Sequence, residues 1–536
     1  MDTQYGWLLN LVCFLPLVGA LVMLVFIGRR DVVAIRRATV AIAAADLALA
    51  LPLWFLYRPD GAEFQFVTRF DWLATLGVQV FLGADGFAVL LILLTTLIGL
   101  IASISSFAIV GQRHKEFCAF LLMLQTGAIG VFSSLDLILL FTFFEMMLVP
   151  AYFLIGIWGG ERRLSAAVKF LLVHLTGSGF FLIGILALYF FNADGLAAAG
   201  LTGLGNEPAF SLPQLYSVAA AIPVQLQLWV FIAFFLGLAV RIPLVPLHTW
   251  MPDALVEAPM AASVMLASVA VNVGVFGIVR VAMPLLPHAT ADAAGWVGAL
   301  ALVGIVYGAL VAMAQKDMKR LVVTMAVSHM GMAVLGLFTF DGPGLSGAML
   351  QLVNHGVSIG ALLLLIGMIE QRRETRLVGE FGGLARVMPL FATFFLIAVL
   401  SAVGMPAFNG FVSRFLILIG VYRQSGLWTL IALFGLVIGA ACMIWMYQRV
   451  FFGEVTSERN EVLEDLNRRE RWLVLPLLAI VLWIGLAPQP VLDRLQPTVD
   501  RVVERMSVTV PQAPETDTRD AAGAAFDDDG LPPGEN

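Results

Sequence analysis

Charge is what this sequence lacks most. Charged residues make up 13% of the 536-residue chain, whereas they make up about a quarter of an ordinary soluble domain. Hydrophobic residues account for 60%, and the mean hydropathy is +0.93. This composition excludes a soluble globular protein of this size and predicts a polytopic protein of the lipid bilayer.

Cysteine and strong basic character are also scarce. The three cysteines, Cys13, Cys118 and Cys442, lie in apolar segments at no metal-ligand spacing. A disulfide framework, a zinc site and an iron–sulfur site are therefore not expected. No cofactor motif is visible, so we expect no cofactor. The formal net charge of −6 gives no support for nucleic-acid binding.

Apolar runs of about 20 residues, the length that crosses a bilayer as a helix, recur along the chain. We count about fourteen, so the expected fold is an all-α polytopic membrane protein. The runs lie near residues 7–27, 37–57, 86–108, 117–133, 135–158, 166–191, 224–245, 259–283, 294–314, 320–340, 344–369, 388–421, 426–450 and 472–488.

Basic residues gather in alternate loops. They follow the first, third, fifth, ninth, eleventh and thirteenth runs, whereas an opposite loop such as 192–223 holds none. Loops rich in lysine and arginine stay on the cytoplasmic side. We therefore expect a multi-pass protein of the bacterial inner (cytoplasmic) membrane with both termini on the outer face.

Two segments outside the runs differ in character. Residues 58–86 alternate polar and aromatic residues, which indicates an external hairpin. After about residue 507 the chain turns to proline, glycine, alanine and acidic residues. We expect residues 496–536 to form an acidic, disordered tail.

Glu145 interrupts the apolar run 135–158. A carboxylate at bilayer depth is costly to place, so it is read first as part of an ion pathway or relay. The alternative is an acid that is protonated or held in a hydrogen bond between helices. We favour the pathway, because other charged residues and histidines recur at similar depth.

Two of the runs contain helix-breaking residues: Pro243 and Pro246 in one, and Gly404, Pro406 and Gly410 in the other. Proline removes a backbone donor and opens a helix. Such breaks persist at membrane depth only when they are buried in protein or line a wet cavity. The two regions are 163 residues apart, measured from Pro243 to Pro406, which is close to one five-helix unit.

This spacing predicts two five-helix repeats, residues 116–285 and 286–455. An odd number of spans inverts the second repeat relative to the first. The remaining units are N-terminal transmembrane helices with the hairpin (1–115), a cytoplasmic loop with the last transmembrane helix (456–495), and the tail (496–536). The alternative is two unrelated kinks, because proline is common in membrane helices.

Four stretches carry a resemblance to a known family: LDLILLFTFFEMMLVPAYFLIGIWGGERRLSAAVKF (135–170), RIPLVPLHTWMPDALVEAP (241–259), MAQKDMKRLVVTMAVSHMGM (313–332) and DLNRRERWLVLPLLAIVLWIGLAPQPVLD (465–493). They closely resemble the M-subunit family of respiratory complex I (NADH-quinone oxidoreductase), which is antiporter-like and translocates protons. The resemblance covers residue 1 to about residue 495. It implies fourteen helices with two inverted five-helix repeats, a proton route from the cytoplasm to the outside, and charged residues along the midplane.

The same resemblance implies a non-redox subunit without a redox cofactor. The redox energy would come from quinone chemistry elsewhere in the complex. The implied partners are other membrane subunits of a complex I-like assembly, and the transported species is the proton.

The family's charged positions match only in part. Glu145 matches the glutamate on the fifth span, but Arg241 stands where the family has the partner lysine. Asn272 takes the place of the central lysine on the eighth span, and Arg414 takes the place of the glutamate that ends the route. Arginine stays charged under protein conditions, so Arg241 can pair with an acid but is a poor proton carrier.

The histidines match better. His248, His329 and His355 match family positions, and histidine can shuttle protons near neutral pH. His174 is a further candidate that is peculiar to this sequence. Lys169 precedes it on the sixth span, where we expect that span to approach Glu145. For each isolated histidine the alternative is a hydrogen-bonded residue between helices.

Three functions stay open. In the leading hypothesis the chain contributes to proton translocation coupled to quinone reduction by NADH. Glu145 and Arg241 form a switchable ion pair, Lys169 modulates it, and the histidines at 248, 329 and 355 organise a water path. The second is a paralogue that has lost conduction and has a structural or coupling role, favoured by the changes at 241, 272 and 414. The third is a subunit of a related membrane hydrogenase or inorganic-carbon-uptake complex.

Overall fold

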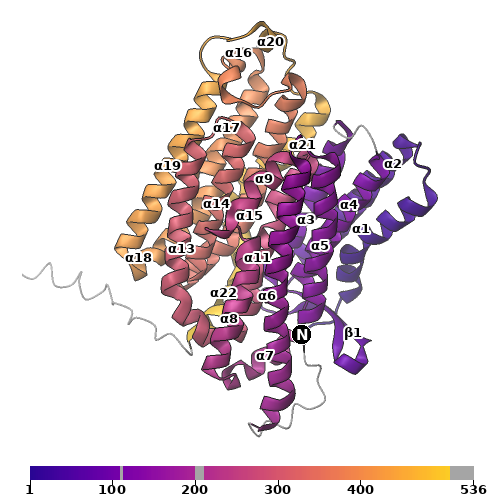
Figure 1. Ribbon diagram of the computed structural model, residues 1–536, viewed down its shortest axis with the longest axis vertical. Helices are drawn as coiled ribbons and strands as arrows, with labels where there is room; N and C mark the ends of the chain where they lie inside the picture. Colours follow the sequence, from indigo (N-terminus) through magenta and orange to yellow (C-terminus); the bar gives the residue numbers. More distant parts are fainter. Residues whose placement is uncertain (109–112, 199–209, 508–536) are drawn as a thin grey trace, which may run out of the picture.

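The computed structural model describes residues 1–108, 113–198 and 210–507, and long helices packed side by side make up most of it (Figure 1). Among these residues, twelve helices are long and apolar enough to cross a membrane, or thirteen if the bent pair α21–α22 counts as one span. The prediction of an all-α polytopic membrane protein is confirmed. The twelve spans are α1 (Gly6–Phe26), α2 (Val32–Leu56), α3 (Gly86–Ser105), α4 (His114–Ser133), α5 (Leu137–Trp158), α6 (Arg163–Ala198), α8 (Val224–Arg241), α10 to α12 (Met260–Leu285), α13 (Pro287–Met313), α14 (Met318–Leu337), α15 (Gly342–Arg373) and α19 (Gly426–Phe451).

Two predicted runs remain. Run 472–488 corresponds to α21 (Arg468–Leu486), and run 388–421 is two helices, α17 (Pro389–Val403) and α18 (Asn409–Gln424). Between them Gly404 has φ 84°, a left-handed conformation that a residue without a Cβ adopts at little cost. The first proline-containing run breaks in the same way. There α8 ends at Arg241, and the chain continues through a 3₁₀ turn (Leu247–Thr249) into α9 (Trp250–Glu257).

Several spans begin at an aspartate. An aspartate at the first position accepts a hydrogen bond from a backbone N–H that the helix itself leaves unpaired. This is observed at Asp31 for α2, Asp85 for α3, Asp136 for α5, Asp317 for α14 and Asp341 for α15. These caps fix where the spans start, so the register of the buried polar side chains follows from the sequence.

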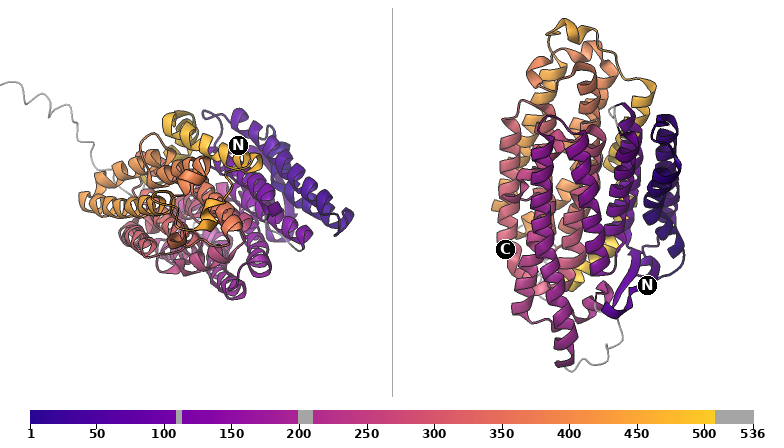
Figure 2. Two further views of the ribbon diagram at one scale, coloured as in Figure 1. Left: turned by 90° about the horizontal axis from the view of Figure 1, so that it is seen from above. Right: turned by 45° about the vertical axis from the view of Figure 1, so that its right-hand side comes forward.

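The two ends of the bundle are built differently. The predicted hairpin is confirmed as an antiparallel pair, β1 (Gln65–Leu73) and β2 (Val78–Ala84), and it lies near the N-terminus and α7 (Leu212–Val218) (Figures 1 and 2). The opposite end carries the short helices α16 (Leu384–Val387) and α20 (Glu458–Glu461).

Residues 496–507, which we expected to open the disordered tail, are helical. α21 (Arg468–Leu486) is followed by α22 (Gln489–Ser507), which is bent from it by 74°. α22 buries Val491, Leu495, Val499 and Val502, and Arg505 pairs with Glu63 at 2.8 Å. The prediction of disorder for residues 496–507 was therefore wrong. Apolar residues recur there every three to four positions and form one buried face of a helix, although the segment is polar on average. Residues 508–536 lie outside the described part of the chain.

The two broken helices have similar neighbours. α6 contacts both halves of the first, α8 and α9, and α15 contacts both halves of the second, α17 and α18. Spans α14 and α15 and the span from α10 to α12 are almost entirely buried, whereas α2 and α19 lie at the periphery. The span from α10 to α12 contains two π-helical segments, 266–270 and 278–282. Asn272, His329 and His355, discussed below, lie on these most buried spans.

Candidate functional site

Glu145 and Arg241 meet, as predicted. The Nη2 atom of Arg241 lies 3.3 Å from Oε1 of Glu145 and donates a second hydrogen bond, of 3.0 Å, to Oγ of Ser178. The guanidinium also lies over the ring of Phe144, 4.2 Å from its centroid. The Arg241 side chain is 7% exposed and that of Glu145 28%. The pair joins α5 to the last residue of α8, where the helix breaks. A change in either charge therefore alters a contact at the broken segment.

His174 lies close to this pair. Its ring lies 4.3 Å from the Trp250 ring and 4.1 Å from the Phe170 ring, and its Nδ1 atom is 2.8 Å from the Phe170 carbonyl oxygen. His174 and Arg241 line the same small cavity. The structure therefore places this histidine beside the arginine.

Lys169 does not bond to Glu145. Its Nζ lies 2.7 Å from Oδ2 of Asp253 on α9 and donates a hydrogen bond of 2.7 Å to the Thr249 carbonyl. Arg320 on α14 lies 3.4 Å from the other carboxylate oxygen of Asp253. The sixth span does pack against α5, which carries Glu145, but Lys169 itself pairs with Asp253 on α9.

His248 lies within the 3₁₀ turn after the break and is separate from the other histidines. Its ring centroid is 5.2 Å from that of Tyr307, and its buried Nδ1 has no hydrogen-bond partner among the described residues. Asn272, at the start of α11 (Asn272–Gly277), donates from Nδ2 to the carbonyls of Ser268 and Leu352. Its Oδ1 is buried and likewise unpaired within the described chain.

His355, His329 and Arg414 form a continuous row. Nε2 of His355 lies 3.1 Å from the Ala267 carbonyl oxygen, and the two histidine rings are 5.8 Å apart. Arg414 donates from Nη2 to Nε2 of His329 at 2.9 Å and also to the Ala402 carbonyl. The second half of the molecule therefore carries a fixed cation next to two histidines.

A polar network that the sequence analysis missed surrounds the break between α17 and α18. Oγ of Ser401 donates to Oδ1 of Asn409 at 2.5 Å, and Asn354 donates to the Asn409 carbonyl and to Ser413. Ser413 in turn donates to Oε1 of Gln351 at 2.6 Å. Isolated neutral polar side chains in apolar runs give no charge signal. Only the spacing of Gln351 and Asn354, three residues apart on α15, could have indicated a shared polar face.

Two buried acids were also missed. Asp46 on α2 accepts a hydrogen bond of 2.6 Å from Gln125 on α4. Asp85 pairs with Arg280 at 2.8 Å, and both side chains are nearly inaccessible. Asp46 could have been found by the same criterion that selected Glu145, since it interrupts the run 37–57.

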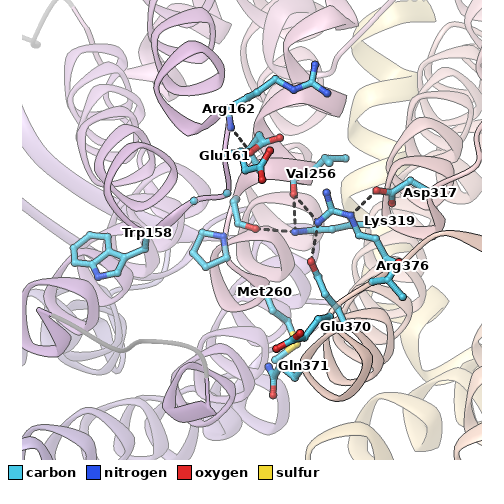
Figure 3. A pocket seen from close by; sticks show the side chains of 18 of the residues that line it. Trp158, Glu161, Arg162, Val256, Met260, Asp317, Lys319, Glu370, Gln371 and Arg376 are labelled. Carbon is cyan, nitrogen blue, oxygen red and sulfur yellow. Dashed lines mark hydrogen bonds and ion pairs between the residues drawn. The ribbon is translucent and has the colours of Figure 1, made fainter. Parts of the chain in front are cut away.

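A pocket of about 600 Å³, shown in Figure 3, opens where α5, α9 and α15 end and α14 begins. Inside it, Nζ of Lys319 donates to the carbonyls of Val256 and Ala258 at 3.1 and 2.7 Å. Arg376 bridges Asp317 and Glu370 at 2.5 and 2.9 Å. Burial lowers the pKa of Arg376, but the charge of Asp317 and the hydrogen bond to it raise that pKa by more. The pKa of Arg376 therefore lies above its ordinary value. The pocket thus joins the end of α9 to α14 and α15.

The described residues contain no group of three histidine, cysteine, aspartate or glutamate side chains that could hold a metal ion. They do contain two buried groups inside an apolar bundle: Glu145, Arg241 and His174 form one, and His355, His329 and Arg414 form the other. Such groups can bind, orient and pass protons, with or without water between their members.

The comparisons with known proteins agree with one another. The profile of the NADH:quinone oxidoreductase/Mrp antiporter transmembrane family matches residues 134–439. The chain is 34% identical over 501 residues to NADH-quinone oxidoreductase subunit M of Rickettsia typhi, covering 92% of this chain and 98% of that protein. It is 36% identical over 507 residues to subunit M of Rhodobacter capsulatus, covering 93% and 96%.

Solved structures show the same relationship. A chain of respiratory complex I from Thermus thermophilus matches with TM-score 0.83 and 29% identity, covering 93% of this chain and 99% of that one. A chain of the Mrp complex from Dietzia matches with TM-score 0.79 at 21% identity, covering 95% and 100%, which shows a shared fold. These neighbours are subunits of larger complexes, so other membrane subunits are the partners of this multi-pass protein. The chain therefore belongs to the NADH:quinone oxidoreductase/Mrp antiporter family, as an antiporter-like M-type membrane subunit of complex I.

Proposed function

We propose that this subunit contributes to proton translocation coupled to quinone reduction by NADH, with the ion pair of Glu145 and Arg241 as its switch. The observation that supports the switch is the position of the pair. A half-buried acid on α5 holds a buried cation at the residue where α8 opens. Protonation of the acid removes one charge, and the unpaired cation must then find another partner or move.

The other polar residues have supporting roles in this proposal. Arg414 holds a fixed charge at the end of its row, while His329, His355 and His248 carry or orient protons and water. Asn272 orients water without charge. Lys169 acts on the switch indirectly, through Asp253 and α9.

We further propose the two inverted repeats at 116–285 and 286–455, and an orientation with both termini on the outer face. The repeats are supported by the packing of α6 on both halves of the first broken helix and of α15 on both halves of the second. The basic residues of the loops next to α16 and α20 support a cytoplasmic position for that end.

A second candidate function is a structural or coupling subunit that conducts no protons. It is favoured by one observation: in the described chain the partners of Arg414 are a histidine and a carbonyl, with no carboxylate. A permanent cation without an acid repels protons that approach along the row.

Glu145→Gln in the intact complex tests the proposal. The substitution keeps the shape and removes the charge, so we expect fewer protons pumped per electron, with the complex still assembled and still reducing quinone. The measurement is proton uptake and NADH oxidation in the same membrane vesicles. Glu454→Gln, a change at an exposed loop residue, is the matched control. Normal pumping by Glu145→Gln would favour the structural candidate.

A further inference from the structure

We propose that His174 is the proton acceptor beside Arg241, and that a single water molecule in the cavity between them carries the proton to its Nε2 atom. The inference rests on the proposed function and deepens it. It answers a chemical difficulty: the arginine at position 241 keeps its proton, so another group must bind the proton at this point.

The cavity has a suitable size and lining. About 20 Å³ of the cavity is open to the centre of a water-sized sphere. By the same measure, one water molecule needs about 10–15 Å³. Arg241 and His174 are its hydrogen-bonding side chains with free capacity; Trp250 also lines it, but its indole N–H already donates to the Val240 carbonyl at 2.8 Å. The other lining residues are mainly apolar, so a water there is directed toward the histidine and the arginine.

The hydrogen bond at Nδ1 fixes which ring nitrogen can accept a proton. The Phe170 carbonyl, 2.8 Å away, can only accept a hydrogen bond. Nδ1 of neutral His174 therefore carries the hydrogen, and Nε2 carries the lone pair. The contacts with the Phe170 and Trp250 rings hold the imidazole in this orientation.

Arg241 supplies the other half of the arrangement. Both of its side-chain hydrogen bonds within the described chain come from Nη2. The N–H groups of Nη1 and Nε are thus free to donate to the oxygen of the water, which then directs a hydrogen toward Nε2 of His174. The guanidinium orients the water without losing a proton.

The proton balance of the step is simple. An excess proton reaches the water, an O–H bond breaks, and an Nε2–H bond forms, which gives the imidazolium; the reverse step releases the proton. The charged group beside His174 is Arg241 on α8, which lines the same cavity and opposes a charged imidazole. Glu145 on α5 pairs with that arginine, while Asp253 on α9 and Lys169, on the same helix as His174, pair with each other. An ionised Glu145 offsets part of the charge of Arg241, so proton uptake by the imidazole is favoured when Glu145 is ionised.

The test compares His174→Gln with a rescue variant in the intact, assembled complex. Glutamine can hold a water but cannot take up a proton, so we expect a clear loss of protons pumped per electron while quinone reduction continues. Adding Arg241→Lys should restore pumping, because lysine can release its own proton. His288→Gln, at the start of α13, is the matched control and should pump normally.

The outcomes separate this inference from the proposed function. If Glu145→Gln lowers pumping and His174→Gln does not, the inference is wrong and the proposed function stands. If His174→Gln lowers pumping but Arg241→Lys gives no rescue, His174 has only a structural role, and the inference is again overturned. Should His174→Gln fail to assemble, His174→Asn with and without Arg241→Lys decides by the same comparison. Normal pumping by both Glu145→Gln and His174→Gln would overturn the proposed function itself.

Discussion

Arg414 donates a hydrogen bond from Nη2 to Nε2 of His329 at 2.9 Å. Because a guanidinium has no acceptor, Nε2 must carry the lone pair, and the proton of His329 lies on Nδ1. While this hydrogen bond is present, Nε2 cannot be protonated, so the His329 ring is neutral. The remaining partner of the arginine among the described side chains and backbone is the Ala402 carbonyl, so the positive charge of Arg414 is not balanced by an acid in the described chain.

Arg414→Glu is expected to reverse this relationship. A carboxylate accepts a hydrogen bond from His329 and favours its charged form, so proton uptake at this end of the row should increase. We expect more protons pumped per electron, measured in vesicles across a range of pH. Arg414→Lys retains a cationic donor and serves as the control. Equal pumping by wild type, Arg414→Glu and Arg414→Lys would mean that protons do not pass this position.

The spans and their breaks were predicted correctly because their signals are local. Apolar runs of the length of a bilayer give the spans, and proline and glycine mark the two breaks. Arg241 lies 96 positions from Glu145, and its pairing with that acid was predicted from the family resemblance, together with the rule that an isolated acid in an apolar run needs a partner.

The features that were missed depend on which faces of distant helices meet. Lys169 pairs with Asp253, 84 positions later, and nothing in either segment specifies the rotation of α6 against α9. The network of Asn354, Asn409 and Ser413 arises only when α15 crosses the break between α17 and α18. Neutral polar side chains are inexpensive in helices until they are buried together, so they give no signal beforehand.

The pair of Glu145 and Arg241 should show strong coupling in a double-mutant cycle. Removing one partner leaves a charge without its counterpart inside the bundle, whereas removing both leaves none. We expect Glu145→Gln and Arg241→Gln each to destabilise the complex more than the double variant does, with a coupling energy of about 1–3 kcal/mol. Thermal unfolding of the purified complex measures it. Strictly additive losses would show that the two charges do not interact.

The pair of Lys169 and Asp253 should contribute much less stability. Each side chain is 37% exposed, and such pairs typically contribute less than about 1 kcal/mol. Lys169→Gln and Asp253→Asn should therefore leave assembly intact, and if Lys169 acts through Asp253 their effects on proton pumping should be equal and not additive. Arg320→Gln is the control for the weaker contact of Asp253 at 3.4 Å. A larger effect of Lys169→Gln than of Asp253→Asn would point to a second partner for the lysine.

Asp46 and Gln125 should behave as a neutral pair. Gln125 donates to one carboxyl oxygen of Asp46, while the other carboxyl oxygen and the amide oxygen of Gln125 are both buried acceptors without a donor among the described residues. A proton on Asp46 satisfies both, because the acid O–H can donate to the amide oxygen. Asp46→Asn supplies the same donor and should leave thermal stability unchanged, whereas Asp46→Leu leaves the amide unpaired and should cost about 1–3 kcal/mol. If Asp46→Asn destabilised the complex as much as Asp46→Leu, the carboxyl group would have to be ionised and paired with a cation.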